Sequence, residues 1–473
     1  MSSTVFWFRN DLRLHDNEAL LRAYKRGKVT PVFIIDERWF KDFSHGFPKV
    51  GAFRMQFILE SVQNLRQQLL QINSNLLVRV GRPEEIIPKL ADALGASHVV
   101  ASKEVTEEET DVETALSQAL KPLNIDIDLV WTRSLYHALD LPFQIHFLPD
   151  IFTEFRKRME RGAKIRVTFS TPSSIGDFPA ELDAGEIPSL ESLGYEPVQK
   201  ESRGVLDFKG GEEEGLKRLR YYLWETQLLK TYKETRNGLL GGDYSSKFSP
   251  WLAVGCLSPR KIYEEIRQFE AKYGANDSTY WLIFELLWRD YFIFVSLKYG
   301  SRMFKIQGIK LDVSKTWKQD ISKFTKWVNG ETGIPFIDAN MKELKQTGFM
   351  SNRGRQNVAS FLAHDLEIDW RWGARYFESQ LLDYDVCSNW ANWNYVAGIG
   401  NDPRENRYFN VVKQGKMYDS KGKYVKHWLP ELQKMNDSMI HTPYLAHEND
   451  LKTAGVEIGK NYPRPLVRIL PPR

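Results

Sequence analysis

Short apolar runs alternate with amphipathic stretches over the first 130 residues of the chain. The runs have the length and β-branched content of buried strands, and the stretches between them repeat apolar residues with a helical period. The expected strands cover residues 4–8, 30–35, 76–80, 98–101 and 126–130, and the clearest helices cover residues 51–71, 83–94 and 107–120. This alternation predicts a parallel sheet covered by helices. Residues 9–16, directly after the first strand, contain no glycine, so dinucleotide binding of the Rossmann type is not indicated.

From residue 211 onward the pattern becomes one of amphipathic helices without comparable strands. These helices are expected at residues 216–232, 259–273, 279–299, 318–328, 336–347, 358–365 and 371–382. Between the two regions, six prolines and clusters of Ser and Gly interrupt the periodicity. We therefore predict a doubly wound α/β domain in residues 1–131, an irregular connector in residues 132–210 and a larger all-α domain in residues 211–473.

Composition narrows the class of protein. The chain has 473 residues, 42% of them hydrophobic and 27% charged, and no apolar run is long enough to span a bilayer. Two cysteines exclude a disulfide framework and any thiolate metal cluster. The first strand begins almost at the N-terminus and leaves no room for a targeting peptide, so we expect a cytoplasmic monomer. A nuclear location, or an organellar protein after processing, would be compatible with the same start.

The net charge of +4 is too small to indicate nucleic acid, but its distribution is uneven. Residues 404–434 hold eight Lys or Arg, among them Arg404 and Arg407, against three acids, with four Tyr or Phe between them. Such a segment suits a polyanionic surface such as DNA. A solvated, lysine-rich loop is the simpler alternative.

Residues 383–395 form the most unusual run in the chain. They combine Asp383, Asp385 and Asn389 with two tryptophans and Tyr395, a mixture that an ordinary core segment does not need because buried polar groups must find partners. We interpret the run as a loop that binds a polar, redox-active aromatic ligand.

Three further segments could contribute to such a site. Residues 238–249 form a glycine-rich stretch followed by Ser245, Ser246, Lys247 and Ser249, donors that suit a pyrophosphate, although an ordinary inter-helix loop would look similar. Residues 351–357 place two arginines and three amides at a helix start, where Arg355 could pair with Asp383.

The third segment is residues 285–291. Glu285 and Arg289 are four residues apart, and Trp288 is three residues after Glu285, so the three could share one helix face. Either they line a pocket that accepts a base, or Glu285 and Arg289 form an intrahelical ion pair beside a core tryptophan.

Seven short segments together resemble the photolyase/cryptochrome flavoproteins, in the family's order and over essentially the whole chain. They are residues 7–17, 257–260, 287–289, 350–353, 368–371, 383–385 and 428–432. Residues 231–237, the pair Gln356 and Asn357, and Tyr395 resemble the DASH branch of that family.

The resemblance implies a folded FAD in the helical domain. Matching positions for the phosphates and ribityl chain are Tyr232, Ser245, Ser246, Lys247, Phe248 and Ser249, although the family often has Arg where Lys247 stands. Around the ring system they are Asn352, Arg355, Asp383, Asp385 and Asn389, the last opposite the flavin N5 atom. Trp393, Trp370 and Trp317 match the family's path for electrons between the flavin and the surface; three core tryptophans would be the structural alternative.

The implied activity is light-driven repair of cyclobutane pyrimidine dimers by electron transfer from excited reduced flavin to a flipped dimer. Glu285 and Trp288 match the catalytic carboxylate and the stacking indole, and the DNA-binding positions would also include Gln356, Tyr395, Arg404 and Arg407. Gln356 and Tyr395 replace more apolar residues, which fits a preference for single-stranded DNA.

The α/β domain resembles the family's antenna domain, which often carries a methenyl-folate. Glu107 matches a folate-contacting acid, but the acidic residues around it also suit a solvated helix start. The competing functions are a blue-light photoreceptor that regulates transcription through flavin photoreduction, and a DNA-binding flavoprotein without turnover.

Overall fold

The computed structural model describes residues 3–41, 43–404 and 407–470. Residues 3–130 form a parallel five-stranded sheet in the order β5-β2-β1-β6-β7. The strands are β1 (Ser3–Phe8), β2 (Lys28–Asp36), β5 (Leu77–Gly81), β6 (Ala96–Ser102) and β7 (Asp126–Val130). The main helices that cover it are α1 (Glu18–Arg26), α3 (Ala52–Gln71), α4 (Pro83–Ala93) and α5 (Glu107–Leu120).

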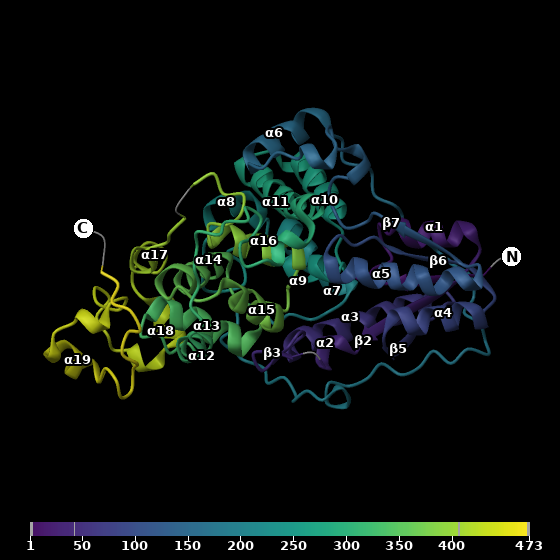
Figure 1. Cartoon of the computed structure of the whole chain (residues 1–473). Helices are drawn as coiled ribbons and strands as arrows, with labels where there is room; N and C mark the ends of the chain where they lie inside the picture. Colours follow the sequence, from purple (N-terminus) through teal and green to yellow (C-terminus); the bar gives the residue numbers. More distant parts are fainter. Residues whose placement is uncertain (1–2, 42, 405–406, 471–473) are drawn as a thin grey trace.

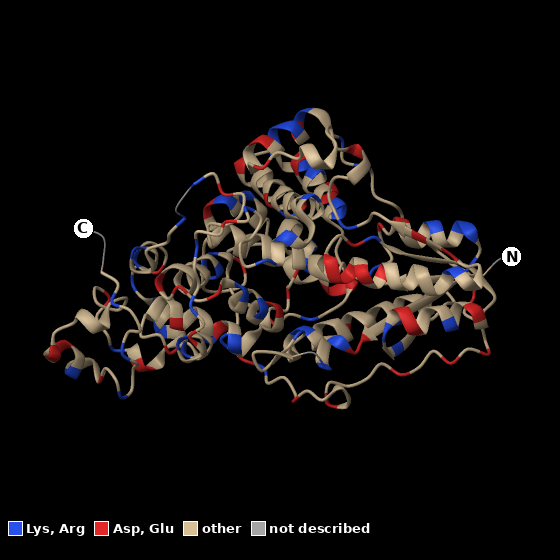
Figure 2. Ribbon diagram, in the orientation of Figure 1, with Lys and Arg blue, Asp and Glu red and all other residues tan. Residues whose placement is uncertain are grey.

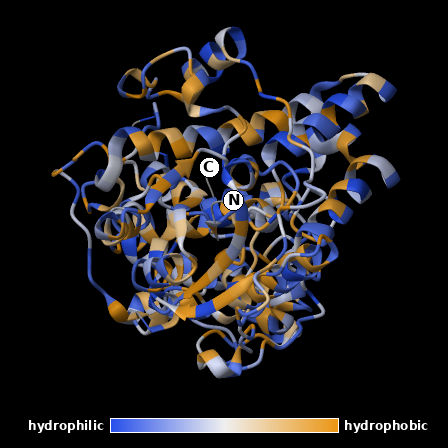
Figure 3. Cartoon of the chain, turned by 90° about the vertical axis from the view of Figure 1, so that its right-hand side faces the viewer, coloured by the Kyte–Doolittle hydropathy of each residue, from blue (hydrophilic) through white to orange (hydrophobic). Residues whose placement is uncertain are grey.

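Helices on both faces bury the sheet, because every crossover between parallel strands must lie over one face. Phe6, Phe8 and Phe33 point into the core shared with the helical domain, whereas Val5 and Val32 point into a separate cluster with α4 and α5. Figure 3 shows the strands largely in the colours of apolar residues. The predicted doubly wound α/β domain is thus confirmed.

A short helix α2 (Arg38–Lys41) and a small hairpin of β3 (Phe43–Ser44) and β4 (Phe47–Pro48) follow β2. The connector after β7 is irregular except for the eleven-residue helix α6 (Phe152–Gly162) and short 3-10 turns. Helix α6 packs on a long helix of the next domain, α11 (Asp277–Tyr299), above the body of the molecule in Figure 1.

The second domain is helical, as predicted. Besides α11 its elements are α7 (Glu212–Arg220), α8 (Tyr232–Thr235), α9 (Ser249–Ala253), α10 (Pro259–Tyr273), α12 (Ile321–Asn329), α13 (Pro335–Thr347), α14 (Asn352–Ser360), α15 (Trp370–Gln380), α16 (Val386–Val396), α17 (Val411–Tyr418), α18 (Lys423–Trp428) and α19 (Glu448–Ala454). Helices α7 and α14 each run on into a single π-helical turn, at Tyr221–Glu225 and Phe361–Asp365. The interpretation of residues 383–395 as a loop was wrong, because most of this run lies in α16, capped by the Asp385 side chain on the Ser388 amide.

The turn after β1 joins the two domains. The carboxylate of Asp16 accepts two hydrogen bonds from the Arg260 guanidinium, at 2.7 and 3.0 Å. The carboxylate of Glu212 accepts a hydrogen bond from the Leu14 backbone N–H at 2.6 Å. These buried charges are paired across the junction, which fixes the relative position of the sheet and the helices.

Within the described residues, no helix is long and apolar enough to cross a membrane. The same part of the chain contains no cluster of His, Cys, Asp or Glu arranged to hold a metal ion.

Candidate functional site

A cavity in the helical domain lies between one side of α14, one side of α16 and the end of α15. Its lining combines two acids, an arginine and several carboxamides with apolar walls, the composition of a site for a polar aromatic ligand. The lining residues are Asn352, Arg355, Gln356, Ala359, Phe377, Leu381, Asp383, Tyr384, Asp385, Ser388, Asn389, Asn392, Trp393 and Val396.

The predicted pairing of Arg355 with Asp383 is present at this cavity. One guanidinium nitrogen of Arg355 lies 2.8 and 2.9 Å from the two carboxylate oxygens of the buried Asp383. The Ser249 hydroxyl donates to the same carboxylate at 2.7 Å, so the start of α9 is tied to this pair. The amide nitrogen of Asn389 donates to the Ala374 carbonyl at 3.0 Å, which fixes how its side chain is turned at the cavity wall.

Asp385 lines the cavity and also has partners within the protein. It caps α16 and also accepts a 2.6 Å bond from Arg133, a connector residue that sequence analysis did not single out. Burial would raise the pKa of Asp385, but Arg133 and Arg289 hold it below its ordinary value. Asp385 therefore stays ionised and joins the connector to the wall of the cavity.

The loop at residues 245–249 presents a buried cation. Lys247 is 3% exposed, donates to the Ser245 hydroxyl at 3.0 Å and lies over the Tyr244 ring. Burial lowers its pKa well below the ordinary value, with only partial compensation from Glu343. A bound phosphate would supply the missing counter-charge, so this donor set fits the pyrophosphate of a dinucleotide.

The other residues predicted to bind the cofactor here are Tyr232, Ser246, Phe248 and Asn352. Tyr232 begins α8, where burial raises its pKa to about 12, and Ser246 and Phe248 are both buried. Asn352 opens α14 behind the Ser351 cap and lines the cavity.

Two of the three predicted tryptophans are buried, and the third is half-buried. Trp393 lines the cavity and packs against Phe377, with ring centroids 5.2 Å apart. Trp370 is fully buried and donates its indole N–H to the Ile306 carbonyl at 3.1 Å. Trp317 is only half-buried. This order is the one expected for a path from the cavity to solvent.

On the other side of α16 lies a second aromatic surface. Trp288 stacks on Phe152 of α6, with centroids 3.6 Å apart and rings within 9° of parallel. Its edge meets Tyr395 at 6.0 Å and 84°, and the Arg407 guanidinium lies 4.6 Å from the Tyr395 ring centre. Both Arg407 and Arg404 are ion-paired to the buried Asp402.

The alternative of an intrahelical pair between Glu285 and Arg289 is wrong. Glu285 pairs with Arg236, and Arg289 donates instead to backbone carbonyls, including that of Leu252 at 3.3 Å. Burial lowers the pKa of Arg289, and Asp385 opposes that shift. Arg236 was missed as a functional candidate, although it lies in residues 231–237, which carried part of the resemblance. The nearby Gln356 accepts a 2.9 Å bond from Arg353.

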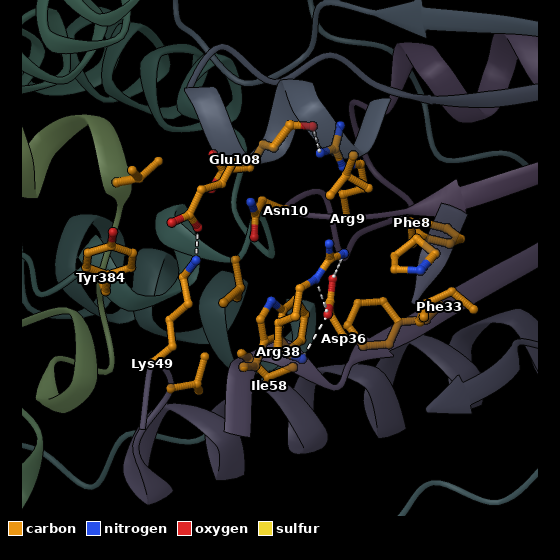
Figure 4. Close-up of a pocket in the computed structure, with 18 of the residues that line it drawn as sticks. Phe8, Arg9, Asn10, Phe33, Asp36, Arg38, Lys49, Ile58, Glu108 and Tyr384 are labelled. Atoms are coloured by element: carbon orange, nitrogen blue, oxygen red, sulfur yellow. Dashed lines mark hydrogen bonds and ion pairs between the residues drawn. The ribbon is translucent and has the colours of Figure 1, made fainter. Parts of the chain in front are cut away.

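A larger cavity of about 480 Å³ lies between the two domains (Figure 4). Its walls include Trp7, Phe33 and Trp39 from the sheet side, and Tyr384 and Glu378 from the helical domain. Charged side chains also line it: Arg38 bonds Asp36 at 2.5 and 2.8 Å, and Lys49 pairs with Glu108.

Glu107, predicted to contact an antenna chromophore, is exposed and is not among the lining residues of this cavity. The next acids in the first turn of α5, Glu108 and Glu109, do line it. The acidic start of α5 faces the helical domain in Figure 2.

The chain is similar to photolyases and cryptochromes. Residues 4–173 match the family model described as DNA photolyase, and residues 281–470 match the FAD binding domain of DNA photolyase. Cryptochrome DASH from Gloeobacter violaceus is 52% identical, over 98% of this chain and 93% of its own length. Cryptochrome DASH from Xenopus laevis is 51% identical, over 97% and 88%.

Solved structures that resemble this chain come from the same family. A cryptochrome from Synechocystis sp. PCC6803 superposes with a TM-score of 0.96 at 50% identity, over 99% of this chain and 97% of that one. A bacterial class III photolyase from Agrobacterium tumefaciens gives 0.84 at 30% identity, over 99% and 95%.

Proposed function

The chain belongs to the photolyase/cryptochrome family and to its DASH cryptochromes, and from this premise we propose that it binds FAD and repairs cyclobutane pyrimidine dimers under blue light, chiefly in single-stranded DNA. The observation that carries the proposal is the right-angled pair of Trp288 and Tyr395, whose ring centroids are 6.0 Å apart. Trp288 lies on α11, and Tyr395 lies on α16 together with the cavity residues Asn389 and Trp393. An aromatic corner beside a flavin cavity is suited to hold a flipped, damaged base pair.

The residues present fit FAD. Ser245, Ser246 and Lys247 would hold the pyrophosphate, because the buried ammonium of Lys247 needs an anion. Tyr232, Phe248 and Ser249 would enclose the phosphates and ribityl chain, and Asn352, Arg355, Asp383, Asp385 and Asn389 would hold the ring system. Bound and reduced, FAD would supply the light-absorbing one-electron donor.

Glu285 has the catalytic role in this proposal. In its protonated form, its carboxyl would donate a hydrogen bond to a carbonyl oxygen of the dimer, where negative charge develops during repair. In the free protein Arg236 holds this carboxylate. A DNA phosphate would compete for the Arg236 guanidinium and so release Glu285 toward the base pair.

The preference for single strands follows from the polarity of this pocket. Gln356 and the Tyr395 hydroxyl make it less apolar, so less free energy is recovered when a dimer leaves the duplex. Extrusion costs a few kcal/mol from a duplex and least from an unpaired strand. Arg404 and Arg407 would contact the phosphates.

The interdomain cavity supports an antenna chromophore of the folate class, as a separate part of the proposal. The Glu108 and Glu109 carboxylates can accept the N–H edge of a pterin, and Lys49 and Arg38 can face the carboxylates of its tail. Glu108 and Glu109, rather than Glu107, carry this part. Folate fluorescence in the purified protein, lost in Glu109→Gln, is the measurement that tests it.

The repair proposal is tested by illuminating the reduced protein with dimer-containing oligonucleotides and following recovery of thymine absorbance. We expect recovery on the single strand, slower recovery on the duplex and none in the dark. No recovery on either substrate would overturn the enzyme assignment and favour a blue-light photoreceptor.

A further inference from the structure

Tyr384 connects the tryptophans of the helical domain with the interdomain cavity. Its hydroxyl accepts the indole N–H of Trp390 at 3.1 Å. The Trp390 ring lies 5.7 Å from that of Trp370, at 81°, so the two indoles are in van der Waals contact. Trp390 is 5% exposed and Trp370 is fully buried.

A buried carboxylate completes this arrangement. The carboxylate of Glu378, which is 9% exposed, lines the interdomain cavity together with Tyr384, and its charge acts on the Tyr384 phenol. Tyr384 therefore accepts a hydrogen bond from Trp390 and has the Glu378 carboxylate as a neighbouring base. Tyr384 lines both the flavin cavity and the interdomain cavity, where Figure 4 shows its ring at the edge.

We propose that Tyr384 is the terminal electron donor of a side branch that leaves the tryptophan path at Trp370 and runs through Trp390, with Glu378 as the acceptor of its phenolic proton. The branch rests on the proposed path through Trp393 and Trp370. It differs from that path in ending at the interdomain cavity instead of the outer surface near Trp317.

The electrons and protons balance as follows. Photoexcited oxidised flavin is the one-electron oxidant and takes one electron from Trp393. The radical cation formed there then passes to Trp370 and on to Trp390. Tyr384 returns one electron to the Trp390 radical cation, and its O–H bond breaks as the proton moves to the Glu378 carboxylate. The products are neutral Trp390, a neutral tyrosyl radical and a protonated Glu378, and return of the electron reverses each transfer.

The surroundings of Tyr384 favour this coupled step over loss of an electron alone. The Arg54 guanidinium lies 4.5 Å from the centre of its ring, which disfavours a radical that keeps the proton and a positive charge. Burial, followed by the charge of Glu378, raises the pKa of Tyr384 well above its ordinary value, so the phenol does not ionise beforehand. Burial also raises the pKa of Glu378, which makes it a stronger base than an exposed carboxylate.

The test is transient EPR on the FAD-loaded, full-length protein, oxidised and free of DNA, grown with ring-deuterated tyrosine. We expect a light-induced tyrosyl signal that narrows on deuteration, disappears in Tyr384→Phe and Trp390→Phe, and survives in Tyr376→Phe. Tyr376 is the matched control because it is buried and contacts Trp327, while burial alone shifts its pKa.

The proton acceptor has its own readout. Glu378→Gln keeps the shape of the side chain but cannot take the proton, so the tyrosyl signal should fall while tryptophan radicals persist longer. The same persistence should appear in wild-type protein in deuterated water. Only tryptophan radicals in the wild type, or a tyrosyl signal that survives Tyr384→Phe, would overturn the branch. These radical signals need no DNA, so they are expected even if the repair assay fails. Photoreduction that survives Trp393→Phe would refute the path on which the branch rests.

Discussion

The buried carboxylate of Asp383 holds two segments that are more than a hundred residues apart in sequence. It accepts the Arg355 guanidinium at 2.8 and 2.9 Å and the Ser249 hydroxyl at 2.7 Å. One side chain thereby joins the start of α14 to the end of the loop at residues 245–249, which we propose binds phosphate. The ring end and the phosphate end of the proposed flavin site are held by the same group.

Asp383→Asn should therefore release FAD. Asparagine keeps the shape but loses the charge that compensates Arg355, and breaking a buried pair costs about 3–5 kcal/mol. We expect much lower flavin content at equal protein, measured from the flavin-to-protein absorbance ratio. Asp277→Asn is the control, because Asp277 has an ion pair with Lys233 but its side chain is 81% exposed. Equal flavin content in the two variants would contradict this role.

Glu285→Ala should slow repair while FAD stays bound, because Glu285 lies outside the residues that line the proposed flavin cavity. Loss of one transition-state donor typically costs about 10²–10³ in rate. The measurement is the repair rate at saturating light and substrate. Glu264→Ala is the control, since Glu264 is ion-paired to Lys261 on the neighbouring helix α10. A variant that loses FAD would show that Glu285 acts on the cofactor side.

The fold could largely be predicted because each domain repeats one kind of pattern. The strands alternate with helices of regular period, and this local signal determined the α/β class. Residues 383–395 were harder, because α16 carries Asn389, Trp393 and Tyr395 on several faces and is buried nearly all round. A helix without a polar face has no amphipathic period to detect.

The partners of charged residues could not be predicted from spacing. Glu285 and Arg289 are correctly spaced for an ion pair, yet Glu285 pairs with Arg236 and Arg289 bonds backbone carbonyls. Asp385 meets Arg133 from a connector that has no motif at all. Such pairs depend on how distant segments pack, which periodicity does not report. The interdomain cavity was missed for the same reason.

Glu343 should make the protein less stable as the pH rises. It is fully buried beside Tyr424, which donates to it at 2.6 Å, and burial raises its pKa from 4.5 to about 7. Between these values the folded state holds a proton that the unfolded state has lost, so stability falls with rising pH and levels off above about pH 7.

We expect Glu343→Gln to remove a fall of roughly 3 kcal/mol between about pH 5 and pH 8, measured as the free energy of unfolding in denaturant. Glutamine can still accept the Tyr424 hydroxyl. Glu331→Gln, at an exposed position, should follow the wild-type curve. Parallel curves for Glu343→Gln and wild type would refute the assignment.

Arg404→Ala should weaken binding of single-stranded DNA mainly at low salt. The Arg404 side chain is 68% exposed, so it can reach a phosphate. Removing one phosphate contact lowers the slope of log affinity against log salt by about one. Fluorescence anisotropy over a salt series measures this slope, and Arg22→Ala on α1 is the matched exposed control. An unchanged slope would remove Arg404 from the DNA surface.

Trp393→Phe should block photoreduction of the oxidised flavin while leaving FAD bound. Trp393 lines the flavin cavity and packs on Phe377, so phenylalanine keeps the apolar wall but lacks the readily oxidised indole. The measurement is the bleaching of oxidised flavin absorbance under blue light with an external reductant. Trp428→Phe is the control, since Trp428 is equally buried but packs in the separate C-terminal cluster with Tyr424 and Leu432. Dimer repair should persist in Trp393→Phe once the flavin is reduced chemically, because repair draws its electron from the flavin and not from the tryptophans. Unchanged bleaching in Trp393→Phe would show that electrons reach the flavin by another route.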